Sequence, residues 1–248
     1  MGDGYYKGMN YKETTYYQDK YFTFPIEVFR MLLDKPEEKF RDVLCWQIAD
    51  ATGEHRERLI KDYYLTESDR QRGEEMKGMA SYSGVNFSLS VKMFDKYYCT
   101  LPYREESDLL ELLAYLALKS LRGNYKIVLC DSEKLLIRMS GYVGKDSLLS
   151  AGENDVGRIK YYMQTERRAR ETVRKLRLVL MEDFKEFHTY SCTHKRGFAY
   201  MFSNGKREQC MRQMAELMES RTQRYKESKY GAMMRDATRA AKVKMNSG

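Results

Sequence analysis

The stretch TERRARETVRKLRLVL, residues 165–180, carries apolar and cationic side chains at a helical spacing. Because a helix turns by about 100° per residue, the apolar side chains fall in one narrow sector. They are Ala169, Val173, Leu176 and Leu180, and Tyr162 joins them if the helix begins near Asp155 rather than Thr165. Arg167, Arg170 and Arg174 fall in a sector of roughly 60° on the far side. The pattern predicts a helix that ends near Met181, with one packed face and one cationic face.

Further cations flank this predicted cationic face. Arg168 and Lys175 lie on one side of it, Arg177 lies toward the other, and Lys160 is added if the helix begins early. Runs of exposed charge are often no more than a solvated surface, and Glu166 and Glu171 are placed to pair with these cations. The stretch alone therefore leaves two interpretations open, a solvated helix face and an anion-binding face.

The segment that follows, HTYSCTHKRGFAYMFS at residues 188–203, has two aromatic and β-branched runs around a basic tip. This pattern predicts a β-hairpin with Lys195 and Arg196 at its tip. The segments before the long helix predict further elements. They are a buried helix beginning near Ser107 (LLAYLALKSLRGN, 112–124), a short strand (YKIVLC, 125–130), a short helix capped by Asp131 or Ser132 (SEKLLIRMSG, 132–141) and a short helix at 146–151.

Taken in order, residues 107–203 predict a helix, a short strand, a short helix, a loop, a long basic helix and a two-stranded hairpin. This order resembles the winged helix-turn-helix DNA-binding proteins of the plasmid replication initiator or transcription regulator type. The resemblance implies that the third helix enters the major groove of double-stranded DNA and that the hairpin touches the backbone. Arg167, Arg170 and Arg174 would then read base edges, while Lys195, Arg196 and the flanking cations would contact phosphates. The long glycine-containing loop at 141–157 departs from the family pattern.

Charge is distributed unevenly along the 248 residues. Residues 151–248 hold 22 Lys and Arg against 12 Asp and Glu, a net charge of +10, whereas residues 1–150 hold 22 against 24, a net charge of −2. A basic half favours a negatively charged partner, most commonly nucleic acid. An alternative of another class is a non-catalytic interaction or assembly module whose basic half docks an acidic partner.

Four segments are expected along the chain: a flexible Tyr-rich arm (1–21), a helical domain (22–106), the winged-helix domain (107–203) and a basic C-terminal helix (204–248). In the second segment, Ile26, Phe29, Leu32 and Leu33 predict a helix after Pro25, and a second helix follows Pro36. Residues 52–80 predict one or two solvated helices, and residues 85–93 fit both a strand and a helix. The fold class expected is mainly α with a small β-hairpin.

The C-terminal helix carries an apolar stripe formed by Met211, Met214, Leu217 and Met218. Packing inside the chain is the favoured role for this stripe, because methionine fills irregular gaps in a core. A homodimer through this helix or through the N-terminal helices is the protein partner that the sequence allows.

Sequence motifs for catalysis or for metal and cofactor binding are missing. The chain contains no P-loop, GxGxxG, GxSxG or HExxH motif, so no enzyme activity, cofactor or metal is expected, although a tyrosine nucleophile of a DNA-nicking enzyme stays open. The five cysteines are odd in number and widely spaced, which is typical of a reducing compartment. With no apolar run of about 18 residues and no signal sequence, a cytoplasmic protein without membrane contact is expected.

Overall fold

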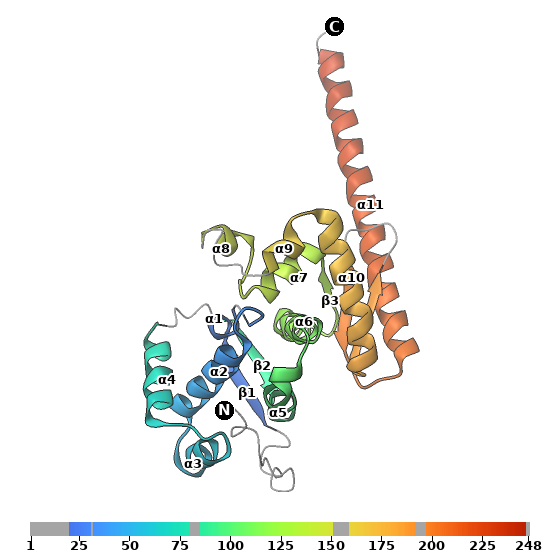
Figure 1. Cartoon of the computed structure of the whole chain (residues 1–248). Coiled ribbons are helices and arrows are strands. Elements are labelled where there is room, and N and C mark those ends of the chain that lie inside the picture. The colour runs from blue at the N-terminus through green and yellow to red at the C-terminus, as the bar shows by residue number, and fades with distance from the viewer. Residues whose placement is uncertain (1–19, 31, 80–84, 151–158, 192–196, 247–248) are drawn as a thin grey trace. The chain divides into compact units, whose positions relative to one another are not determined.

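The fold is mainly α with two small antiparallel sheets, as a computed structural model of the chain shows (Figure 1). The structure describes residues 20–30, 32–79, 85–150, 159–191 and 197–246. The expected fold class is therefore confirmed. The Tyr-rich segment lies outside the described residues up to residue 19, and so does the hairpin tip that contains Lys195 and Arg196.

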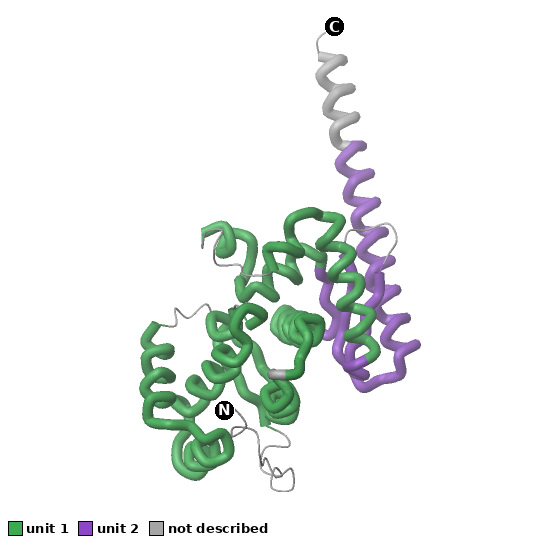
Figure 2. Tube along the Cα trace, in the orientation of Figure 1, with its two compact units in different colours: residues 1–125, 131–182 green, residues 126–130, 183–248 purple. Residues whose placement is uncertain are grey.

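The chain forms two compact units (Figure 2). Unit 1 comprises residues 1–125 and 131–182, and unit 2 comprises residues 126–130 and 183–248. This division cuts across the boundaries expected from the sequence, because the strand at 128–130 pairs with a strand near residue 200 rather than with its neighbours in sequence. The elements expected to form one winged-helix domain thus belong to two compact units.

The N-terminal part of unit 1 combines a two-stranded sheet with helices. Its elements are β1 (Tyr21–Pro25), α1 (Ile26–Phe29), α2 (Pro36–Asp50), β2 (Asn86–Ser90) and α5 (Val91–Thr100). In the antiparallel pair, Phe24 faces Phe87, and both side chains are buried. Alternate residues of β1 point inward, as a half-buried strand requires. The ambiguity at 85–93 has a simple origin, because a strand ends at Ser90 and a helix begins at Val91.

The helix expected at 26–33 is wrong beyond its first turn, because α1 ends at Phe29. Arg30 already has an extended backbone, with a ψ of 147°. Its guanidinium lies 4.0 Å from the centre of the Tyr142 ring, and its Nε donates to the Gly141 carbonyl oxygen at 3.4 Å. Leu32 and Leu33 are nevertheless buried. The apolar spacing thus identified residues of the core correctly. The early end of α1 coincides with the contacts that Arg30 makes with residues far along the chain.

Two helices, α3 (Gly53–Asp62) and α4 (Glu67–Met79), account for the charged segment expected to be helical. Arg41 of α2 joins them, since its Nε donates to Asp69 Oδ1 at 2.9 Å and its Nη1 to the Tyr63 carbonyl oxygen at 3.3 Å. Cys45 lies beside this pair, and burial raises the pKa of its thiol to about 12. Charged surface helices are thus fixed to α2 by a partly buried ion pair.

The remaining helices of unit 1 follow a short 3-10 turn, η2 (Leu101–Tyr103). They are α6 (Glu106–Arg122), α7 (Ser132–Met139), α8 (Lys145–Ser150), α9 (Ile159–Met163) and α10 (Glu166–Asp183). α6 is buried from Leu109 to Leu118 and contacts both α7 and β2, as its nearly all-apolar sequence predicts. Asp131 caps α7 by accepting a hydrogen bond from the Lys134 backbone nitrogen at 2.7 Å.

Unit 2 consists of a three-stranded antiparallel sheet and one long helix. Its elements are β3 (Val128–Cys130), β4 (Phe187–Ser191), β5 (Phe198–Phe202) and α11 (Arg207–Asn246). The strand order is β3-β5-β4. Ala199 and Met201 of β5 pack against Met214 and Met218 of α11, and all four side chains are buried. The prediction that the methionine stripe packs within the chain is confirmed for Met214 and Met218.

Among the described residues, no helix is both long enough and apolar enough to cross a membrane.

Candidate nucleic-acid interface

The packed face of α10 is the one predicted from its sequence. Ala169, Val173, Leu176 and Leu180 are its buried residues. The helix does not extend back to Asp155, however, because Gln164 and Thr165 separate α9 from α10. Tyr162 is therefore only half-buried, and its hydroxyl lies 3.1 Å from Glu106 Oε1. Lys160 is exposed on α9, so the two residues do not extend the faces of α10.

The cationic face of α10 is exposed, but two of its three central arginines are paired. Arg167 Nε lies 3.0 Å from Glu171 Oε1, and Arg170 forms an ion pair with Glu166. Both pairs join residues four positions apart on the solvent side of the helix. Such exposed pairs contribute only about 0.3–0.5 kcal/mol to stability. They neutralise much of the local positive charge, and an incoming anion can displace them at small cost.

Arg174 and Lys175 keep their charges available. In the part of the chain that the structure describes, neither side chain forms a salt bridge, and both are exposed. The hydrogen bond from Arg167 lowers the pKa of Glu171, and the charges of Lys175 and Arg174 lower it further. Glu171 therefore stays ionised at neutral pH, with three cations around it. The local charge balance of α10 is positive at this position.

The flanking cations differ in their exposure and in their contacts. Arg168 is half-buried, stacks on the Tyr161 ring at 4.2 Å and donates to the Tyr161 carbonyl oxygen at 3.2 Å. It also hydrogen-bonds to Gln164. Arg168 therefore joins α9 to the start of α10. Arg177 is half-buried as well.

The sequence interpretation missed an apolar component of the exposed face. Leu178 is 51% exposed and Val179 is 41% exposed. At 100° per residue, Leu178 lies about 180° from the buried face and in line with Arg174. The same angular arithmetic that located the arginines would have found it. Side chains of this kind contact thymine methyl groups in DNA major grooves.

The predicted hairpin is present in unit 2 as β4 and β5, paired from Phe187 opposite Phe202 to Ser191 opposite Phe198. His188 is buried, and its Nε2 lies 3.0 Å from the Ser203 carbonyl oxygen. This contact gives the histidine a structural partner inside the hairpin. The tip residues lie outside the described residues, so the proposed phosphate contacts of Lys195 and Arg196 stay predictions.

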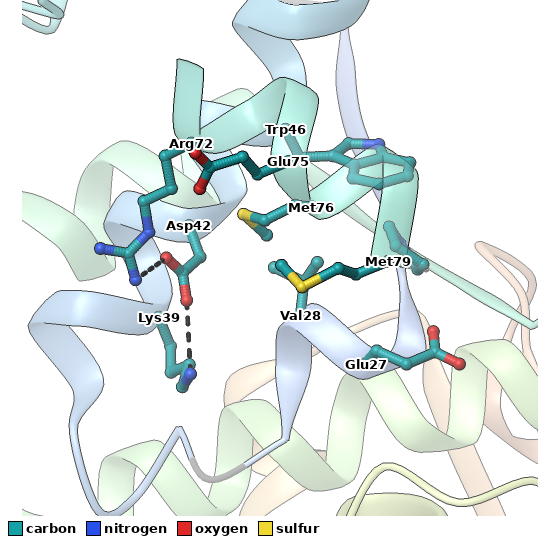
Figure 3. Close-up of a pocket in the computed structure, with 10 residues that line it drawn as sticks. Glu27, Val28, Lys39, Asp42, Trp46, Arg72, Glu75, Met76 and Met79 are labelled. Atoms are coloured by element: carbon teal, nitrogen blue, oxygen red, sulfur yellow. Dashed lines mark hydrogen bonds and ion pairs between the residues drawn. The ribbon is translucent and has the colours of Figure 1, made fainter. Parts of the chain in front are cut away.

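A pocket of about 330 Å³ opens in unit 1 near α1, α2 and α4 (Figure 3). One side is apolar, with Trp46, Met76 and Met79, and the other side is charged. There the buried Asp42 lies between two cations, 3.3 Å from Lys39 Nζ and 2.6 Å from Arg72 Nη2. Because three carboxylates, those of Glu27, Asp42 and Glu75, line the pocket with these two cations, the pocket does not fit a phosphate.

Metal ligands are not grouped in the described part of the chain, where no three His, Cys, Asp or Glu side chains could hold an ion together. Cys192 and His194, the residues closest to a zinc pattern in the sequence, lie outside the described residues.

No protein-family model, curated protein or solved structure matches the chain.

Proposed function

We propose that this protein binds double-stranded DNA through a winged helix-turn-helix arrangement and acts without catalysis. Replication initiation or transcription control of a mobile element is the biological role that fits such binding. In this proposal α10 is the recognition helix, and β4 with β5 is the wing.

The observation that carries the proposal is the sheet order. Along the chain the elements run α6, β3, α7, α8, α9, α10, β4, β5, so two short helices stand between α7 and α10. The first strand pairs with the last to give β3-β5-β4. This order is the one expected of a winged helix, in which the short first strand is added to the edge of the hairpin. The helix directly before the hairpin is also the one with the exposed arginines. The topology of the sheet in unit 2 and the charge on α10 in unit 1 thus each favour DNA binding.

Each group on α10 has a distinct role in the proposal. Arg174 and Lys175, which form no salt bridge in the described structure, make the first contacts with phosphates or bases. Arg167 and Arg170 exchange Glu171 and Glu166 for DNA, and an arginine fork then matches a phosphate or the O6 and N7 atoms of guanine. Lys160, Arg168 and Arg177 supply flanking charge, while Lys195 and Arg196 contact the backbone from the wing.

Binding to a labelled random duplex, measured by anisotropy across a salt series, tests the function. About five phosphate contacts predict a log–log slope of roughly −4 to −5 between the association constant and the salt concentration. Micromolar binding at low salt with such a slope is the expected result. A protein that leaves the duplex free at low salt contradicts DNA binding, whatever its fold.

Neutralising the two paired glutamates should strengthen duplex binding. In the double variant Glu166→Gln and Glu171→Gln, Arg170 and Arg167 lose their local counter-charges, and two negative charges facing the phosphates disappear. A charge about 7 Å from a phosphate contributes about 0.6 kcal/mol at the dielectric constant of water, so we expect a five- to tenfold increase in affinity, or about 1.2 kcal/mol. Anisotropy titration at a fixed salt concentration measures this change.

The control removes the same charge elsewhere in unit 1, by Glu37→Gln with Glu57→Gln on α2 and α3. Both glutamates are exposed and lie outside the proposed surface. An equal gain in the two double variants would show that net charge alone sets the affinity, and would count against a local role of α10.

A further inference from the structure

Only the first part of α11 packs against the sheet of its unit. Met214 and Met218 are almost fully buried there, whereas every side chain from Glu219 to Tyr230 except Thr222 is exposed. Tyr225 is 64% exposed and Tyr230 is 66% exposed. The helix nevertheless continues to Asn246, beyond the sheet of unit 2 (Figure 1). Most of the stability of a helix in a protein comes from the packing of one face, and this exposed segment lacks such packing within the described structure.

The chemistry of one helix face changes where the packing ends. At 100° per residue, Arg221, Tyr225 and Lys229 lie within about 60° of Met214 and so continue the stripe that packs on the sheet. Thioether side chains are therefore replaced along this stripe by cations and an aromatic ring. Arg224 and Lys226 lie on the two sides of the continued stripe.

The cations at the start of this exposed segment differ in their pairing from those of α10. Arg221, Arg224, Lys226 and Lys229 form no salt bridge with any described residue. Of the two acidic residues nearest to them in sequence, Glu219 is exposed and Glu227 accepts a hydrogen bond from Gln223 Nε2 at 2.9 Å. This differs from α10, where Arg167 and Arg170 are paired with glutamates. The beginning of the exposed segment thus offers more unpaired positive charge than the centre of α10.

Charge argues against a second copy of the same helix as the occupant. Residues 221–246 contain eight Lys and Arg against two Asp and Glu, a net charge of +6. Two copies aligned along this segment would repel each other. The exposed Tyr230, Met233 and Met234 also lie away from the Met214 stripe. In the part of α11 whose side chains are described, up to residue 234, the exposed segment therefore presents no continuous apolar seam of the kind that coiled coils need.

A nucleic-acid backbone complements this segment in both charge and length. The segment spans about 38 Å of helix axis at 1.5 Å per residue. Duplex DNA carries one negative charge for about every 1.7 Å of its axis, so a comparable length offers a dense row of phosphates. Tyrosines among cations suit this partner, because a phenol hydroxyl also donates to phosphate oxygens.

We infer that the exposed segment of α11 that begins at Arg221 forms a second, sequence-independent contact with the phosphate backbone of duplex DNA. The inference rests on the proposed function of α10 and extends it. Arg221, Arg224, Lys226 and Lys229 supply the contacts that can be tested individually. Their role is to add affinity that does not depend on sequence, while α10 reads the site.

The test replaces these four cations by glutamine, which keeps helix propensity close to that of the original residues. The contacts of α11 add to those of α10 and the wing, so the wild-type slope should be steeper by about 3 to 4 than the roughly −4 to −5 expected for α10 and the wing alone. The variant should lose this difference on the same random duplex, since four phosphate contacts disappear. Affinity near 0.1 M salt should fall by tenfold or more. The matched control replaces Lys35, Lys61, Lys92 and Lys96 of unit 1 by glutamine, and should leave the slope unchanged. Circular dichroism at 222 nm checks that α11 stays helical.

Other outcomes separate this inference from the function beneath it. An unchanged slope in the α11 variant, with binding still lost on charge reversal of Arg174 and Lys175, overturns the inference and leaves the function standing. Absence of duplex binding by the wild-type protein overturns both. A labelled poly-glutamate peptide provides the last arm. The wild-type protein could bind this peptide, and the four substitutions could abolish that binding while they leave duplex binding unchanged. This result would assign the segment to an acidic protein partner and overturn the inference.

Discussion

Replacing Gly73 by alanine should lower the free energy of unfolding by about 2 to 3 kcal/mol, the cost of overpacking at a rigid contact. Gly73 lies in the middle of α4, where that helix crosses α2. A Cβ atom at this position would lie 2.0 Å from the Cys45 carbonyl oxygen and 2.8 Å from Ala49 Cβ. Since the first of these is a backbone atom, it cannot rotate away, and the two helices must separate. That movement would also disturb the Arg41–Asp69 pair beside Cys45.

Gly78 provides the matched control for this substitution, because it lies five residues further along the same helix, α4. It is exposed, and a Cβ atom there meets nothing within 4 Å. Gly78→Ala should raise the free energy of unfolding by about 0.5 to 1 kcal/mol, since alanine is the better helix former. Urea unfolding followed by circular dichroism measures both variants. Two variants that are both stabilised would contradict the close crossing of α2 and α4.

The helices of this protein follow from their sequences wherever one face is apolar and the ends carry recognisable residues. Pro36 opens α2, and Asp131 caps α7. The residues of α10 that the spacing assigned to the core are the buried ones. In these segments the local preference and the tertiary packing agree, so the 3.6-residue period is sufficient to identify the element and its buried face.

The strand β1 and the end of α1 could not be predicted in the same way. The alternation of Phe22 and Phe24 in β1 becomes significant only when β2 pairs with it, 60 or more residues later in the chain. Arg30 leaves the helical conformation while it contacts Gly141 and Tyr142, more than 100 residues away. Both features depend on long-range contacts, which leave no periodic signal in the local sequence.

The residues of the candidate site and its possible ion pairs were predictable, but not which pairs form. Spacing located Arg167, Arg170 and Arg174 on one face with Glu166 and Glu171 within reach, and side-chain geometry shows that the first two arginines are paired. Lys160 belonged to the same helix only if that helix began before Thr165. The structure shows the later start, with the Thr165 hydroxyl oxygen accepting a hydrogen bond from the Arg168 backbone nitrogen at 3.1 Å. The four cations of α11 were visible in the sequence as a basic run. Only the structure shows that they begin where α11 stops packing against its sheet, and that they are therefore exposed.

Reversing the two unpaired charges of α10, by Arg174→Glu with Lys175→Glu, should weaken duplex binding by about 100- to 1,000-fold. At about 4 Å in a water-like dielectric, each cation attracts a phosphate by about 1 kcal/mol, and each glutamate replaces that attraction with a similar repulsion. Two positions then account for about 4 kcal/mol at low salt. The slope of the salt series should fall in magnitude by about 2, because two phosphate contacts are lost. Anisotropy across the salt series measures both quantities.

The control for this variant reverses Lys61 and Lys92, which are exposed on α3 and α5 of the same unit. Net charge changes equally in both double variants, so only a local contact can separate their affinities. Both substitutions in α10 lie on its exposed side, opposite Val173 and Leu176, and the thermal unfolding midpoint should therefore change little. A loss of affinity confined to the α10 variant, with the fold intact, assigns phosphate contact to Arg174 and Lys175. Equal losses in the two variants would instead mean that long-range attraction by the whole basic surface governs binding, and α10 would lose its role as the recognition helix.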